Sequence, residues 1–159
     1  MPFNPASSLA ALIETPVRPG VVVWIGARPA RGEAMRAEPV ALLAEGRGLV
    51  GDRYRNTGGA RQLTLIEEES LAAIASHLGR ERVDGEEVRR NLVIRGINLV
   101  ALKGRRFRVG AALLEASGEC HPCSRMEEVL GAGGYNAMRG LGGITARVIE
   151  ARRFGSAMR

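Results

Sequence analysis

The sequence predicts a mainly β fold, a closed or nearly closed barrel of short strands with peripheral helices. Three observations favour this fold. The chain has 159 residues, 21 of them glycine and only 4% aromatic. Its apolar residues are mostly Val, Ile, Leu and Ala, and they occur in short runs broken by turns. Strands and helices do not alternate regularly and no long repeat is visible, which argues against a parallel α/β sheet and a solenoid.

The chain is long enough to bury one substantial core and too short for two ordinary domains. We expect a single domain over residues 21–159, preceded by an N-terminal arm at 1–20. The arm holds four of the seven prolines. Its short apolar stretch from Ser7 to Ile13 could form two helical turns.

From Val21 onward, runs of β-branched and apolar residues alternate with glycine-bearing turns. The firmest helix covers about Glu67 to Leu78, where Leu71, Ile74 and Leu78 recur at helical spacing and acidic residues occupy the first turn. A second, shorter helix is expected near SRMEEVLG (124–131), and RGLGGI (139–144) is expected to be a turn before the last strand. The strand candidates are VVVWIGA (21–27), the region 39–54, RQLTLI (61–66), NLVIRG (91–96), GRRFRVG (104–110), AALLEASGE (111–119) and GITARVIEA (143–151).

The formal charge of +6 is carried by 22 arginines and one lysine. Guanidinium groups bind phosphate and carboxylate with two hydrogen bonds, so an anionic ligand is plausible. The arginines are scattered along the chain, and aromatic residues are too few to stack on bases. We therefore do not expect nucleic acid as a partner.

The only two cysteines, Cys120 and Cys123, are too few for the disulfide framework of a small secreted protein. The chain shows no signal peptide and no apolar run of the ~20 residues needed to cross a bilayer. We expect a cytoplasmic protein without a membrane partner.

The segment CHPC is compatible with a redox dithiol, but the βαβ core and the later proline of a thioredoxin-type site are missing. His121 and His77 do not supply a second ligand pair for zinc. With two histidines in the chain, no hydrolase constellation can be assigned.

Four segments in order resemble the motif series of the MOSC family: GLVGDRY (48–54), RQLTLIEEESL (61–71), VRRNLVIRGINL (88–99) and ECHPCSR (119–125). The resemblance spans roughly residues 20–150 and is to the short bacterial stand-alone members. It implies a MOSC-like β barrel that binds the molybdenum cofactor, a pyranopterin whose dithiolene and one protein cysteine hold the metal. By this resemblance Cys123 is the molybdenum ligand and catalytic residue, and Cys120 is the secondary candidate.

The resemblance also implies residues that bind the cofactor. Arg89 and Asn91 match the R-x-N motif of the family, so Arg89 would bind the anionic end of the cofactor. Asn91 would bind the pterin, or it could instead satisfy turn backbone. Arg61 and Gln62 stand where amidoxime-reducing relatives place small hydroxyl residues against the cofactor phosphate.

Two further arginines are weaker candidates. Arg53 could bind the same anion as Arg89, or it could pair with Asp52 and shape the loop. Arg139, in the glycine-rich turn 139–144, is the second candidate for binding the anion.

The expected function is reduction of N-hydroxylated compounds, such as hydroxylamines and amidoximes, with electrons from an external donor protein. Two alternatives stay open. The chain could be a non-catalytic carrier of sulfur, loaded as a Cys123 persulfide by a desulfurase, or of the cofactor. It could also be a C-x-x-C thiol–disulfide protein.

Overall fold

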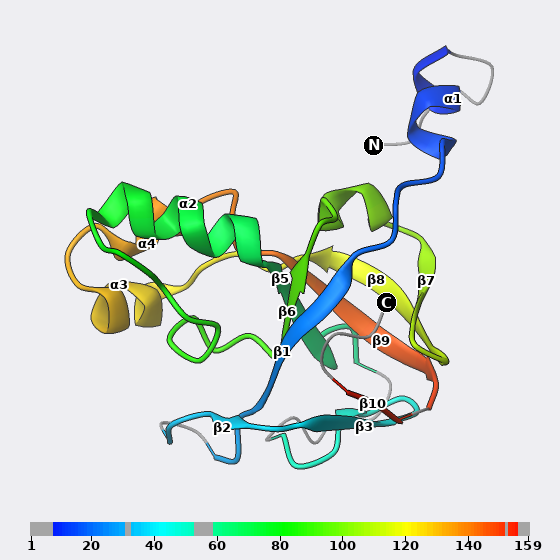
Figure 1. Cartoon of the computed structure of the whole chain (residues 1–159), viewed down its shortest axis with the longest axis horizontal. Coiled ribbons are helices and arrows are strands. Elements are labelled where there is room, and N and C mark those ends of the chain that lie inside the picture. Colours follow the sequence, from blue (N-terminus) through cyan, green and yellow to red (C-terminus); the bar gives the residue numbers. More distant parts are fainter. Residues whose placement is uncertain (1–7, 31–32, 53–58, 152, 156–159) are drawn as a thin grey trace.

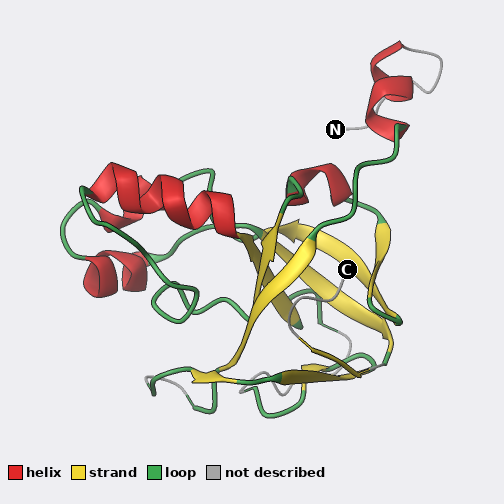
Figure 2. Cartoon of the chain, in the orientation of Figure 1, coloured by secondary structure: helices red, strands yellow, loops and turns green. Residues whose placement is uncertain are grey.

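The computed structural model describes residues 8–30, 33–52, 59–151 and 153–155. Within these ranges the strands form a seven-stranded sheet in the order β2-β1-β6-β5-β9-β8-β7 and a three-stranded sheet in the order β10-β3-β4. The larger sheet curls into a half-barrel, the smaller one lies across one end of it, and α2, α3 and α4 gather on one side (Figure 1, Figure 2). The expected mainly β fold with peripheral helices is thereby confirmed.

The strands are β1 (Val21–Ala27), β2 (Arg36–Ala37), β3 (Val40–Ala44), β4 (Gly48–Leu49), β5 (Leu63–Glu67), β6 (Leu92–Arg95), β7 (Arg106–Val109), β8 (Ala112–Glu119), β9 (Ile144–Glu150) and β10 (Arg153–Gly155). The helices are α1 (Ser8–Glu14), α2 (Glu68–Leu78), α3 (Ser124–Leu130) and α4 (Gly134–Met138), with a 3-10 turn η1 (Leu99–Leu102). Each strand expected from the sequence has its counterpart here. The sequence did not predict the short elements β2, β10, α4 and η1.

Two apolar clusters pack against opposite faces of the larger sheet. Leu65, Leu92 and Leu114 belong to the cluster inside the half-barrel, and Ile66 and Val93 belong to the cluster under the helices. The central strand β5 is therefore buried on both faces, which explains why Leu63, Leu65 and Ile66 are apolar although they point to both faces. Its parallel pairing with β6 places the ends of both strands at the same edge of the sheet.

Helix α2 forms as the sequence predicts. Leu71 and Ile74 are buried, and Glu68 and Glu69 occupy the first turn, where carboxylates interact favourably with the helix dipole. Gly79, with φ of 68°, ends the helix in the left-handed conformation that glycine adopts without strain.

The helix of the arm, α1, is described over Ser8–Glu14 and lies apart from the half-barrel (Figure 1). Arg105 pairs with Glu14, at 2.7 Å, and also donates to the Ile13 carbonyl oxygen. Leu12 stays 70% exposed, so α1 is held through its C-terminal end and not through its apolar side chains. None of the helices in the described ranges has the length and apolar composition that crossing a bilayer would require.

Candidate functional site

The cysteine segment connects the C-terminal end of strand β8 to helix α3. Cys120 follows the last residue of β8, and its backbone N–H donates to the Gly143 carbonyl at 2.8 Å. Cys123 precedes the first residue of α3, and its carbonyl accepts from the Met126 N–H. Both are free thiols, with Cys120 only 3% exposed and Cys123 exposed to solvent.

The glycines of the RGLGGI segment bring the chain close to this cysteine segment. A Cβ atom at Gly142 would lie 1.9 Å from the Cys120 carbonyl oxygen, and one at Gly143 would lie 1.8 Å from the Leu65 carbonyl oxygen. Only glycine allows both approaches. The segment precedes β9 as expected, and its tight packing fixes the position of the backbone at Cys120.

The segment VRRNL enters the same region from the start of β6. Arg89 has a φ of 58°, a left-handed conformation that costs a non-glycine residue backbone energy, and its Nη1 donates to the Glu33 carbonyl at 2.7 Å. Arg90 is buried, and it donates to the carbonyl oxygens of Gly142, Val88 and Cys120. Neighbouring arginines of one motif thus point to different partners.

These two segments meet at a cavity of about 370 Å³. Cys123 and Cys120 line it together with a concentration of arginines that originate from distant parts of the chain. The lining residues are Arg28, Arg61, Thr64, Val88, Arg89, Arg90, Glu119, Cys120, His121, Pro122, Cys123, Arg125 and Met126. Of the residues predicted to form the site, the structure therefore brings together Cys123, Cys120, Arg61 and Arg89.

Asn91 lies beside the cavity in a buried network of hydrogen bonds. Its Oδ1 accepts from the backbone N–H and the hydroxyl of Thr64, at 3.0 and 3.1 Å. Its Nδ2 donates to the Gly26 carbonyl, at 3.1 Å, and to Asp52 Oδ1, at 3.0 Å. Both donors and both acceptor positions of the amide are used within the protein, so its side chain holds β1, β5 and β6 together. A direct contact of Asn91 with the cofactor stays a prediction.

Asp52 extends this network to Arg28. The backbone N–H, Nε and Nη2 of Arg28 all donate to the carboxylate, at 2.8 to 3.1 Å. Burial alone would raise the pKa of Asp52, but the hydrogen bonds and charge of Arg28, with the Asn91 amide, outweigh burial and hold that pKa below its usual range. We call Asn91, Thr64, Asp52 and Arg28 the buried polar network.

Three other arginines of the cavity, Arg61, Arg90 and Arg125, lack a carboxylate partner among the described residues. Among the described residues no carboxylate lies within ion-pair distance of Arg61, Arg90 or Arg125, and Glu119, which also lines the cavity, pairs with Lys103. Burial lowers the pKa of Arg90, and the neighbouring charges of Arg28 and Arg61 act in the same direction. We call Arg61, Arg90 and Arg125 the cationic wall. An anion entering the cavity would meet guanidinium groups whose charge the described protein leaves uncompensated.

The other predicted site residues lie elsewhere. Gln62 is fully buried away from the cavity lining, with Nε2 donating to the Gly59 carbonyl and Oε1 accepting from the Val148 N–H. Arg139 is exposed beside α4 and contacts Asn136. Arg53 lies outside the described residues.

Sequence reasoning missed Arg28, Arg90 and Arg125. Arg90 stands within the R-x-N motif, at its variable position, and Arg125 is two residues after Cys123, so adjacency to the motifs was the available signal. The Arg28 pairing with Asp52 joins residues 24 positions apart and left no local signal.

Comparison with known proteins connects this site to a family. A family model described as MOSC domain matches residues 52–159. No curated protein matches the chain.

Solved structures of the same fold include the YUAD protein from Bacillus subtilis, with a TM-score of 0.75 and 18% identity over 87% of this chain and 93% of that one. YiiM from Geobacillus stearothermophilus has a TM-score of 0.68 and 15% identity, covering 88% of this chain and 73% of its own. YiiM from Escherichia coli has a TM-score of 0.66 and 21% identity, covering 87% and 67%. At these identities the likeness is one of fold.

Proposed function

The chain belongs to the MOSC domain family, and on that premise we propose that it binds the pyranopterin molybdenum cofactor and reduces N-hydroxylated compounds such as hydroxylamines and amidoximes. The observation that carries the proposal is an exposed thiol, Cys123, at a cavity whose cationic wall lacks carboxylate partners among the described residues. That combination fits a metal complex with an anionic tail.

The residues present fit this cofactor. A cavity of about 370 Å³ is within the ordinary range for small-molecule sites. No three His, Cys, Asp or Glu side chains converge in the described ranges, so a metal held by Cys123 would take its other ligands from a cofactor. A soft thiolate suits molybdenum in a sulfur-rich environment.

Each group of residues would have its own task. Cys123 would ligate the metal, and Arg61 and Arg89 would bind the anionic end of the cofactor with Arg90 behind them. His121 is exposed at the cavity, where its ring nitrogens could form hydrogen bonds with the substrate. The cofactor, when bound, would supply the two electrons that, with two protons, convert an N–OH group into N–H and water.

We propose that the electrons come from another protein. Two cysteines cannot hold a cluster that needs four thiolates. We therefore propose an external electron-donor protein as the partner. We also propose the cytoplasm as the location, because two cysteines are too few for the disulfide framework of a small secreted protein.

The test is a metal and activity measurement on protein made in a cofactor-producing host. We expect stoichiometric molybdenum and reduction of N-hydroxylated substrates with an artificial electron donor. Cys123→Ser should remove the activity, whereas Cys120→Ser, at a buried thiol, should keep most of the molybdenum. Wild-type protein without molybdenum would refute the proposal.

The exposure of Cys123 also favours a second candidate, a persulfide carrier. Incubation with a cysteine desulfurase and cysteine would then add about one sulfur atom to Cys123, and a reducing agent would remove it. Mass spectrometry of the intact protein distinguishes this from the reductase, because a carrier acquires the adduct without molybdenum. An unmodified Cys123 counts against the carrier.

A further inference from the structure

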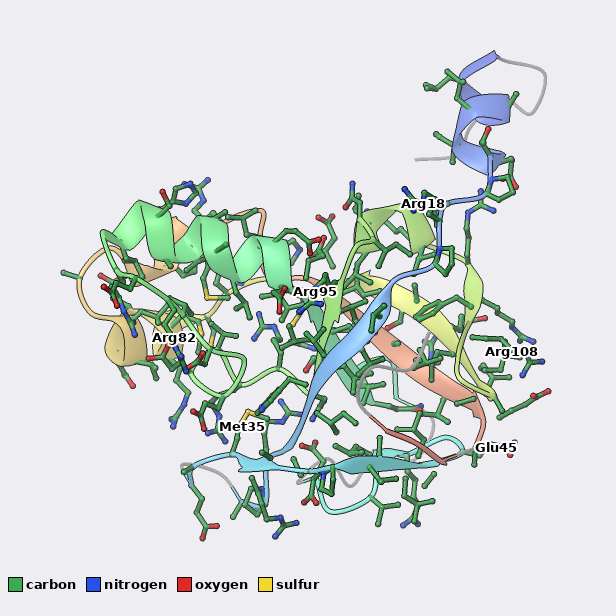
Figure 3. All side chains as sticks on the ribbon, viewed as in Figure 1. Arg18, Met35, Glu45, Arg82, Arg95 and Arg108 are labelled. Atoms are coloured by element: carbon green, nitrogen blue, oxygen red, sulfur yellow. The ribbon has the colours of Figure 1, made fainter. Side chains whose placement is uncertain are left out.

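Arg125 differs from the arginines on the outer surface. Arg82, Arg95 and Arg108 are spread over the molecule (Figure 3), and each forms an ion pair, with Asp84, Glu68 and Glu150 respectively. Arg125 forms no hydrogen bond or ion pair with any described residue, although it is partly buried and lines the cavity.

The Nε atom of Arg125 is the most informative part of this side chain. It is buried and has no hydrogen-bond partner, the one such side-chain atom found among the described residues. A buried N–H donor without an acceptor loses its hydration and gains nothing in return. Native proteins rarely leave such a donor unpaired, and a ligand, an ion or an ordered water supplies the acceptor.

The neighbours of Arg125 add positive charge to the cavity, which favours binding of an anion. Arg90 is buried with its donors on backbone carbonyl groups, which satisfy its hydrogen bonds but do not neutralise its charge. Arg61 reaches the same cavity, where its Nη2 lies 3.9 Å from Cys120 Sγ. A guanidinium offers Nε and one Nη as parallel donors to two oxygens of a phosphate or carboxylate.

We propose that Arg125 binds an oxyanion beside Cys123, with Nε and an Nη as donors and the charges of Arg90 and Arg61 behind it. The ligand class is a phosphate or carboxylate group. It could be the terminal phosphate of the cofactor or an anionic group on the substrate, and only this choice of source rests on the proposed function.

The direct test uses protein from a host that cannot make the cofactor, with inorganic phosphate as the probe. Calorimetric titration at low ionic strength should show one phosphate per chain, and Arg125→Gln should weaken binding at least tenfold. Arg125→Lys keeps the charge but loses the paired donors, so we expect an intermediate affinity.

Arg106→Gln is the matched control. Arg106 is exposed on β7, and its partner Glu115 keeps a second ion pair with Arg147, so this variant removes the same charge without leaving a carboxylate alone. Phosphate affinity should change less than twofold. An unchanged affinity in Arg125→Gln, or equal weakening in Arg125→Gln and Arg106→Gln, would overturn the proposal.

A second measurement identifies the source of the anion. If the anion is the cofactor phosphate, Arg125→Gln made in a cofactor-producing host loses molybdenum. If it belongs to the substrate, the variant keeps molybdenum and shows a raised KM for an N-hydroxylated substrate with a carboxylate, compared with a neutral one.

The two proposals fail separately. Phosphate binding that depends on Arg125 in a wild-type protein that never takes up molybdenum supports the oxyanion site and refutes the reductase. If the protein takes up molybdenum but its phosphate binding does not depend on Arg125, the oxyanion site is refuted and the cofactor proposal is supported.

Discussion

Two neighbouring polar regions of this protein differ in how completely their groups are satisfied. In the buried polar network, the Asn91 amide and the Asp52 carboxylate have protein partners on every side. In the cationic wall, Arg125 has none among the described residues, and Arg90 has only neutral carbonyl acceptors. The first region is complete without a ligand, whereas the second is not. Arg90 and Asn91 are neighbours in the segment VRRNL, yet Asn91 serves stability and Arg90 is available for binding, because their partners differ.

The largest expected effect is on the buried polar network. Asn91→Ala removes four buried side-chain hydrogen bonds, those with the Thr64 N–H, the Thr64 hydroxyl, the Gly26 carbonyl and one Asp52 oxygen, so we expect the free energy of unfolding to fall by about 3 kcal/mol. Urea denaturation measures it. Asn136→Ala removes the same amide from an exposed position on α4 and should change stability by less than about 0.5 kcal/mol. An equal loss of stability in Asn91→Ala and Asn136→Ala would contradict the structural role of the buried polar network.

Asp52 should make the network sensitive to acid. Because Arg28 and Asn91 hold its pKa below the usual value, the ionised carboxylate stabilises the folded state above the unfolded pKa of about 3.9, and this is lost as pH falls through the lower folded pKa. Asp52→Asn should cost about 2 kcal/mol at neutral pH and reduce the loss of stability in acid. Denaturation at several pH values tests this, with Asp84→Asn, from the exposed pair with Arg82, as control.

The cationic wall should instead respond to added anions. If phosphate binds the folded protein alone, a concentration ten times its Kd raises the free energy of unfolding by about 1.4 kcal/mol. Arg125→Gln should lose this stabilisation and Arg106→Gln should keep it. Chloride at matched ionic strength separates the specific effect from general salt effects. Stabilisation of equal size in Arg125→Gln would mean that phosphate binds elsewhere.

The smallest expected effect distinguishes the regions most directly. In phosphate-free buffer, Arg125→Gln should leave the free energy of unfolding within about 0.5 kcal/mol of wild type, because no described partner is lost. Arg28→Gln breaks the pair with Asp52 and should be clearly destabilising. Chemical denaturation of both variants in the same buffer tests the contrast. A large loss in Arg125→Gln would place Arg125 among the structural residues.

The sequence predicted most of the fold because periodicity is a local property. The spacing of Leu71, Ile74 and Leu78 gave α2, and short apolar runs between glycines gave the long strands. The two residues of β2 and the five residues of α4, little more than one helical turn, are too few to show a period. Tertiary contacts determine them.

The site was predictable in part. The resemblance indicated Cys123 and Arg89, which do meet at one cavity, while their roles stay predictions. Among 22 arginines, adjacency to the cysteine motif is the only local feature that sets Arg125 apart from Arg106, and it does not show that Arg125 lacks a partner. What separates them is whether a carboxylate from another segment lies nearby, and a single sequence does not contain that information.

The position of Asn91 also has a consequence for folding kinetics. Its side chain joins residues that are 27, 39 and 65 positions away, so its hydrogen bonds require several large loops to close first. We therefore expect these bonds to form late, after the transition state, with a φ-value near zero for Asn91→Ala. The residue that joins three strands would then act mainly by slowing unfolding, and so would lengthen the lifetime of the site after it has formed.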